Sequence, residues 1–243
     1  MKKPLLRSID WTFGALLRFV LRYLVIHPLI RLNYRVTISG GEAALECTEG
    51  AIIVANHISR IDGPFLMSEA WPYARIRPTA WHAEYSHWLQ WPLMKLFGTI
   101  PLSSPKYLPD EERQRRKEEA IGIMDKVLAA GRHLLIFAEG GIGDGSRVSI
   151  KPHLSGVFKL IEAHHEKPLL FVKIEGLEHS RFGKHRLRGM LFKRLPVHVT
   201  ITRADNISLV GGHEGLNNRI ERFYNEGISL VPERTRRGII LKI

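Results

Sequence analysis

The sequence predicts an α/β protein in which one mixed sheet is flanked by helices and preceded by an amphipathic helical segment. Short apolar runs alternate with longer segments that carry helix start and stop signals, as in sheets covered by helices. The chain has 243 residues, of which 44% are hydrophobic, and this is enough for one sizeable core. We therefore expect an N-terminal segment at residues 1–34 and a single domain at residues 35–243.

Local signals place each element in turn. Ile52 to Val54 form an apolar, β-branched run that is typical of a strand covered on both faces. Pro109 and Asp110 open a long helix, which Gly131 ends. The expected helices span residues 8–32, 63–70, 87–97, 109–130, 153–165 and 213–226. The expected strands span residues 35–39, 51–55, 75–80, 99–102, 133–137, 168–174 and 196–202.

The charge of the chain predicts an anionic partner. The formal net charge is +12, and the basic residues concentrate near the two ends. The sequence lacks an RNP-like aromatic motif, a zinc finger and a recognisable helix-turn-helix, so we expect no nucleic acid partner. The lone Cys47 excludes an intramolecular disulfide and favours a reducing compartment. No Cys/His or HExxH spacing predicts a metal site.

The apolar segment at residues 11–30 resembles a membrane span only at first sight. Arg18 and Arg22 near its centre would each cost roughly 2.5 to 3.5 kcal/mol on insertion. On a helical wheel, Lys3 and Arg7 join these arginines within an arc of about 100°, opposite an apolar face. We expect this helix to lie in an anionic membrane surface on the cytoplasmic side, as a monotopic or peripheral attachment. The alternative is a helix packed on the protein's own core.

A histidine and an aspartate five positions apart mark a candidate catalytic corner. Asn56 and His57 leave the strand, Ser59 follows, and Asp62 stands where Pro64 announces a helix. On one continuous helix the pair would point about 140° apart, but a strand-to-helix corner lets the carboxylate hold one ring nitrogen. The other nitrogen is then free to take a proton from a hydroxyl. An ordinary loop histidine beside a helix N-cap is the alternative.

A second candidate lies about 80 residues later. The strand at residues 133–137 runs into Glu139, Gly140 and Gly141, at the edge of the sheet where ligands of α/β proteins bind. Backbone amides of such a loop can approach an anion or an oxyanion. The segment is not a P-loop, since no GK[ST] follows. The alternative is a plain glycine turn with a solvated Glu139.

Together the two segments resemble the glycerolipid acyltransferase superfamily, which includes the 1-acylglycerol-3-phosphate acyltransferases. The first matches the NHxSxxD block of that family through Asn56, His57, Ser59 and Asp62. The second matches the core of its FPEGTRS block through Phe137, Glu139 and Gly140. The resemblance covers about residues 35–205.

The resemblance implies a membrane-associated O-acyltransferase of phospholipid biosynthesis. A fatty acyl chain would pass from acyl-CoA or an acyl carrier protein to the hydroxyl of a lysolipid, most closely 1-acylglycerol-3-phosphate, with no metal or bound cofactor. His57 would be the general base, and Asp62 would orient and stabilise the imidazolium. The residues that would bind substrate are Asn56, Ser59, Glu139, Gly140, Gly141 and Lys151.

The chain departs from the family pattern after Glu-Gly. Gly141, Ile142 and Gly143 stand where the family usually has Thr-Arg-Ser, so an arginine that normally holds the acceptor phosphate is missing. Lys106, Arg147 and Lys151 are the candidate replacements. The alternatives are an acceptor that lacks a phosphomonoester, such as a lyso-aminolipid, or a non-catalytic lipid-binding relative.

Overall fold

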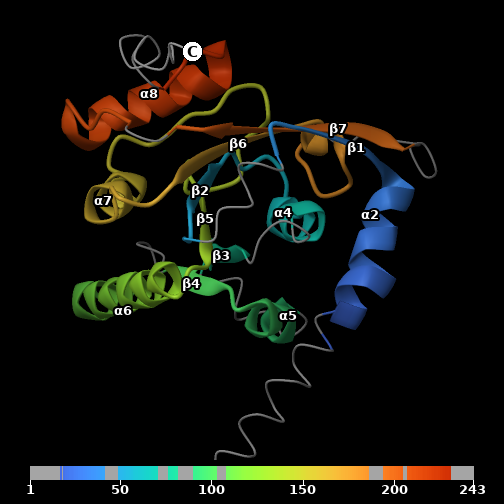
Figure 1. Ribbon diagram of the computed structural model, residues 1–243, viewed down its shortest axis with the longest axis horizontal. Helices are drawn as coiled ribbons and strands as arrows, with labels where there is room; N and C mark the ends of the chain where they lie inside the picture. The colour runs from blue at the N-terminus through green and yellow to red at the C-terminus, as the bar shows by residue number, and fades with distance from the viewer. Residues whose placement is uncertain are drawn as a thin grey trace, which may run out of the picture.

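A seven-stranded sheet forms the centre of the computed structural model, in the order β1-β7-β6-β2-β5-β3-β4 (Figure 1). The structure describes residues 17, 19–41, 49–70, 76–81, 90–102, 108–185, 194–204 and 207–230. The neighbouring strands run parallel except for the antiparallel pair of β6 and β7. The strands are Tyr34–Ser39 (β1), Ile52–Ala55 (β2), Ile76–Trp81 (β3), Ile100–Leu102 (β4), His133–Phe137 (β5), Leu169–Glu175 (β6) and Leu195–Arg203 (β7). The predicted mixed sheet is confirmed.

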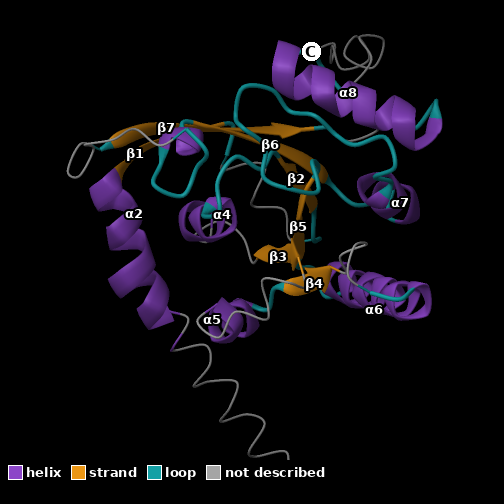
Figure 2. Cartoon of the chain, turned by 180° about the vertical axis from the view of Figure 1, so that it is seen from behind, coloured by secondary structure: helices purple, strands orange, loops and turns teal. Residues whose placement is uncertain are grey.

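Helices cover both faces of the sheet. The α-helices are His27–Asn33 (α2), Asp62–Ala70 (α4), Gln90–Phe97 (α5), Asp110–Ala129 (α6), Gly156–Ala163 (α7) and Gly212–Glu226 (α8). A π-helical segment, Leu21–Ile26 (η1), precedes α2, and a short 3-10 turn, Leu177–His179 (η3), follows β6. Figures 1 and 2 show α2 and α4 on one side of the sheet and α6, α7 and α8 on the other.

The central strands supply apolar side chains to both faces, because successive residues of a strand point in opposite directions. Ile53 and Leu135 pack in the cluster that faces α2 and α4. Val54 and Ile136 pack in the cluster that faces α6, α7 and α8. All four residues of β2 are buried, which explains its continuous apolar run.

The parallel arrangement brings the two candidate segments together. In the register of the sheet, Ala55 at the end of β2 stands beside Phe137 of β5 and Val172 of β6. The chain therefore leaves β2 and β5 at the same edge, and the corner after β2 emerges beside the glycine loop, which we define as residues 138–150.

The expected elements of residues 35–230 that the structure describes are confirmed within about three residues. The helix expected at residues 87–97 is described from Gln90, and residues 82–89 lie outside the described part. Of the helix expected at residues 8–32, residues 8–16 and 18 also lie outside it. Among the described helices, none combines the length and the apolar character needed to cross a membrane.

The expected place of Arg22 on an exposed basic stripe is wrong. Its side chain is buried, donates a hydrogen bond to the carbonyl of Ser68 in α4 (2.8 Å) and lies 4.5 Å from the ring centre of Tyr23. Arg31 of α2 bonds to the buried carboxylate of Glu69 in α4 (2.7 Å). These polar groups find partners on α4, which compensates the cost of removing them from water. The described part of the N-terminal segment is thus docked on the domain.

The opposite side of the same segment exposes apolar side chains. Phe19, Leu24, Leu29 and Leu32 are each more than half exposed, and Leu24 reaches 71%. The described part of the segment therefore does two things. It packs one side on the protein's own core, through residues such as Ile30, and leaves a broad apolar side uncovered.

Candidate active site

The corner after β2 holds His57 and Asp62 in direct contact. The ring nitrogen Nδ1 of His57 lies 2.9 Å from Oδ2 of Asp62, the first residue of α4. The same oxygen accepts the backbone N–H groups of Ile58 (2.7 Å) and Ser59 (2.8 Å). These bonds run back to the residues before the helix, whereas an N-cap would accept N–H groups of the helix itself. The carboxylate therefore fixes both the corner and the imidazole.

This contact leaves the second ring nitrogen of His57 available for proton transfer. When the neutral imidazole donates its Nδ1 proton to Asp62, Nε2 carries a lone pair. Nε2 has no hydrogen-bond partner in the described part of the chain, and 20% of the side chain is exposed. The ring stacks on Phe137 of β5, with the ring centres 4.3 Å apart. Burial raises the pKa of Asp62, while the hydrogen bonds from His57, Ser59 and Ile58 oppose that rise.

The glycine loop holds the backbone of His57 from both sides. Glu139 accepts the backbone N–H of His57 at Oε2 (2.6 Å) and that of Ser149. Gly143 donates its N–H to the carbonyl of His57 (2.6 Å). Glu139 is buried, and burial raises its pKa to about 7 although these hydrogen bonds favour the carboxylate. The alternative of a solvated Glu139 is wrong.

Asn56 and Ser59 make their hydrogen bonds within the scaffold. The amide of Asn56 donates to the carbonyl of Ile174 in β6 (2.8 Å) and accepts its N–H (2.7 Å). Ser59 is fully buried, and its hydroxyl lies 3.2 Å from that of Ser180. Both residues thus attach the corner to β6 and the segment that follows it. A contact of either residue with substrate stays a prediction.

The remaining predicted substrate-binding residues belong to the glycine loop or follow it. Gly140 has a positive φ of 63°, and a Cβ there would lie 2.8 Å from Leu154 Cδ1, so this position requires glycine. Gly141 is exposed with open space beside it. Lys151 is exposed as well. Their roles in binding also stay predictions.

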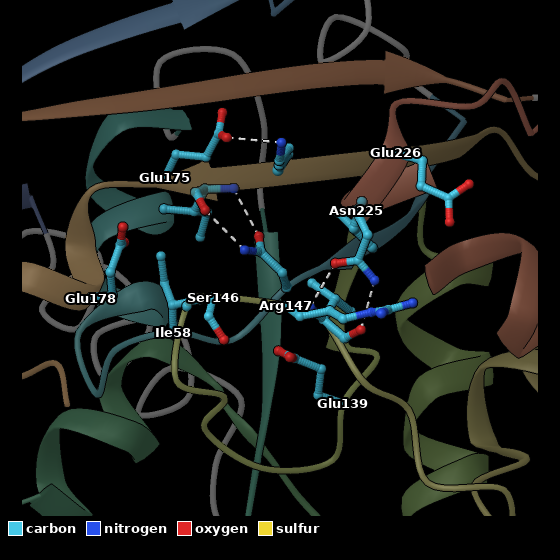
Figure 3. Close-up of a pocket in the computed structure, with 14 residues that line it drawn as sticks. Ile58, Glu139, Ser146, Arg147, Glu175, Glu178, Asn225 and Glu226 are labelled. Carbon is cyan, nitrogen blue, oxygen red and sulfur yellow. Dashed lines mark hydrogen bonds and ion pairs between the residues drawn. The ribbon is translucent and has the colours of Figure 1, made fainter. Parts of the chain in front are cut away.

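A cavity of about 500 Å³ opens at this edge of the sheet (Figure 3). Its walls include Asn56 and Ile58, which flank His57 in the chain, and Glu139 and Arg147 of the glycine loop. Asn225 of α8 closes another side. The cavity therefore adjoins the His57 corner, with Glu139 contacting both, although His57 itself is not one of the lining residues.

Nothing in the sequence pattern indicates the part that α8 plays. The amide of Asn225 accepts the N–H of Val148 (2.8 Å) and donates to its carbonyl (2.9 Å), and Glu221 accepts the N–H of Ile150 (2.5 Å). These side chains lie more than 70 positions from the loop, on a helix whose polar residues look like an ordinary solvated face. Phe137 was expected as a strand residue and as part of the match to the family block, but its stacking on His57 was not predicted.

In the part of the chain that the structure describes, no three His, Cys, Asp or Glu side chains are grouped so as to hold a metal ion. The residues that meet at the corner, one imidazole and one buried carboxylate, instead form a pair suited to moving a proton.

Comparison with known proteins identifies the family. A family model described as Acyltransferase matches residues 35–174, more than half of the chain. The chain belongs to the acyltransferase family. The resemblance found in the sequence is confirmed, and the protein is an enzyme that transfers acyl groups. The matched segment contains His57, Asp62 and Glu139 and ends before α8.

The fold of this acyltransferase is similar to a solved structure. That structure is the crystal structure of the 1-acyl-sn-glycerophosphate (LPA) acyltransferase PlsC from Thermotoga maritima. The two share 19% sequence identity with a TM-score of 0.56, over 86% of this chain and 80% of the other. No curated protein matches the sequence of this acyltransferase. At this identity the likeness establishes the fold, and the substrates are a matter of proposal.

Proposed function

We propose that this acyltransferase transfers a fatty acyl chain from a thioester to the hydroxyl of a lysolipid. The observation that carries the proposal is the corner itself, in which buried Asp62 engages Nδ1 of His57 while Nε2 has no described partner. An oriented imidazole of this kind is suited to general base catalysis on a hydroxyl.

In the proposed reaction, Nε2 of His57 removes the proton from the acceptor hydroxyl as its oxygen attacks the thioester carbonyl. Asp62 stabilises the imidazolium that forms. The tetrahedral intermediate then collapses, the carbon–sulfur bond breaks, and the imidazolium returns its proton to the leaving thiolate. The products are an ester and a free thiol, and the chemistry requires no metal or bound cofactor. Backbone N–H groups of the glycine loop are the nearest candidates for stabilising the oxyanion.

The proposed acceptor is 1-acylglycerol-3-phosphate, and the donor is acyl-CoA or an acyl carrier protein, which places the reaction in phospholipid biosynthesis. The sequence resemblance and the fold shared with PlsC support this choice. A second candidate acceptor is a lysolipid that lacks a phosphomonoester. Ile142 favours it, because this side chain stands where the family usually has an arginine that holds the phosphate.

The test supplies the purified full chain with labelled acyl-CoA or acyl carrier protein and with each acceptor. We expect label in the lipid product, and His57→Ala should lower the rate on the order of 10² to 10⁴ fold. His165→Ala is the matched control, because His165 is exposed at the end of α7, away from the corner. Wild-type rates in His57→Ala would refute the assignment. Lipid binding without turnover for every donor would favour a non-catalytic relative.

We also propose that the enzyme works at an anionic membrane surface, on the cytoplasmic side, through its N-terminal segment. The exposed apolar side chains Phe19, Leu24, Leu29 and Leu32 support this, as does the net charge of +12.

Exposed positions allow this attachment to be tested without unfolding the domain. Leu24→Ser combined with Leu32→Ser should reduce sedimentation with vesicles of phosphatidylglycerol and phosphatidylcholine. Ile121→Ser is the control, because Ile121 is an exposed apolar residue of α6 on the other side of the sheet. Equal sedimentation of all variants would overturn the proposal. Deleting the segment would be a poorer test, because Arg22 and Ile30 are buried.

A further inference from the structure

The cavity beside the corner has a charged wall whose carboxylates already have partners. Glu175 lies 2.8 Å from Lys173 Nζ, and Glu226 lies 3.6 Å from Arg222 Nε, just outside the cavity. The acidic side chains at the rim are therefore at least partly neutralised by neighbouring cations.

Two further carboxylates line the cavity. Glu178 accepts the N–H of Gly176 (2.7 Å) and lies 3.6 Å from His179 Nε2. Glu139 faces the cavity at the base of the loop, where burial raises its pKa to about 7. Burial thus reduces the negative charge that Glu139 carries near neutral pH.

Arg147 also lines the cavity, but its side chain differs from these carboxylates in its lack of a described partner. Its guanidinium makes no salt bridge or side-chain hydrogen bond with any residue that the structure describes. Figure 3 shows Arg147 between Asn225 and Glu139 on the cavity wall. A guanidinium with five free N–H donors is well suited to a phosphate, which it can bind in a two-pronged arrangement.

The backbone on both sides of Arg147 is fixed. On one side, Asp144 accepts the N–H (3.0 Å) and the hydroxyl (2.7 Å) of Ser146 and the backbone N–H of Arg147 itself. On the other, the amide of Asn225 makes two hydrogen bonds with Val148. The loop therefore holds the Cα of Arg147 at the cavity wall and reduces the ordering needed when the side chain binds an anion.

We propose that Arg147 binds a phosphate group of a substrate in this cavity. The inference rests on the proposed function, because it takes the cavity beside His57 as part of the substrate site. Arg147 would supply the positive charge that Ile142 does not. Arg147 and Lys151 are both exposed, but only Arg147 lines the cavity, and Lys106 lies outside the described residues. The phosphate has two possible sources, the headgroup of the acceptor or the phosphates of the coenzyme A donor.

Equilibrium binding tests the proposal without any turnover. Calorimetry on the full chain compares two pairs of ligands, 1-hexanoylglycerol-3-phosphate with 1-hexanoylglycerol, and coenzyme A with pantetheine. We expect Arg147→Gln to weaken the phosphate-bearing member of one pair about 10- to 100-fold and to leave its phosphate-free partner unchanged. The affected pair identifies the source of the phosphate. Lys159→Gln, an exposed position on α7, is the matched control.

The proposal would be overturned if Arg147→Gln bound both phosphate-bearing ligands as tightly as the wild type does. It would also be overturned if the wild type bound neither phosphate-bearing ligand more tightly than its phosphate-free partner. A loss in Lys151→Gln alone would also overturn it, in favour of Lys151. These outcomes are separate from the failure of the proposed function. If Arg147-dependent binding is found but no donor and acceptor yield product, acyl transfer to a lysolipid is wrong while the phosphate site stands.

Discussion

The corner and the glycine loop meet at His57, but they are held in place in opposite ways. The three hydrogen bonds to Asp62 Oδ2 span five, four and three residues. The bonds that attach the loop to α8 span 77 and 71 residues. The contacts of Asp62 with the corner are therefore local, whereas the attachment of the loop to α8 depends on the completed fold.

This difference matters for evolution and for design. The contacts of Asp62 with the corner involve only residues 57–62. The loop takes its shape from side chains outside the segment that matches the family. Its sequence can therefore change, as it does at residues 141–143, while His57 stays held by Glu139 and Gly143.

The largest expected effect concerns the corner. Asp62→Asn keeps an oxygen that can accept the N–H groups of Ile58 and Ser59, but it removes the negative charge that stabilises the imidazolium. We expect acyl transfer to fall on the order of 10² to 10⁴ fold while the circular dichroism spectrum is retained. Single-turnover rates measure the effect. A rate within threefold of wild type, about the limit of the assay, would mean that Asp62 has only a structural role.

The next largest effect concerns Glu139, which joins the glycine loop to the corner by accepting the backbone N–H of His57. Glu139 has a folded pKa of about 7, because it is buried, and an ordinary value of 4.5 when unfolded. A raised folded pKa means that the folded state binds the extra proton. The stabilisation that Glu139 adds to the free energy of unfolding is therefore complete below pH 4.5 and is lost as the pH rises through 7. Its size is about 3 kcal/mol.

Urea unfolding of the wild type and of Glu139→Gln across this range isolates the contribution of Glu139. The glutamine does not titrate, so the wild type should lose about 3 kcal/mol relative to Glu139→Gln between pH 4.5 and pH 8. Parallel pH dependences of the two proteins would show that Glu139 titrates normally. The activity of Glu139→Gln also tests the loop. Glu139 accepts the backbone N–H of His57, so a weaker hydrogen bond there should lower the rate.

The smallest effect concerns the loop alone. A Cβ at Gly143 would lie 2.7 Å from Oε1 of Glu139 and 3.3 Å from the carbonyl of His57, so Gly143→Ala must displace the loop. We expect about a tenfold loss in kcat, because the backbone of His57 shifts. Gly141→Ala is a matched control, since nothing lies within 4 Å of a Cβ there. Equal rates for the two variants would show that the loop does not position His57.

The sequence predicted most of what is local. The apolar runs placed β2 and β5, and the position of His57 and Asp62 at a strand-to-helix corner predicted their contact. The sequence linked the two segments only through the family resemblance, and it is the parallel pairing of β2 and β5 in the structure that brings Glu139 beside His57. These predictions hold because each rests on the period of a strand or helix or on a chain reversal.

What the sequence did not predict depends on distant packing. A helical wheel treats Arg22 as one of a basic stripe and cannot show that Ser68 of α4 offers it a carbonyl. Nor does the spacing of Ser59 reveal the hydroxyl of Ser180, 121 residues away. Asn225 became informative only when the fold placed it against the loop, and the fold also distinguished Arg147, which lines the cavity, from Lys151, which does not.

Because the described part of the N-terminal segment packs on α4, this helix separates that segment from the His57 corner. Glu69 near its end binds Arg31 of the N-terminal segment, and Asp62 at its start binds His57. Seven residues of rise at 1.5 Å separate the two, or about 10 Å. The length of α4 thus sets how far the imidazole of His57 stands from the described part of the N-terminal segment, which we propose contacts the membrane surface. A lipid hydroxyl held at that surface would meet the imidazole at a depth fixed by helix length rather than by loop motion.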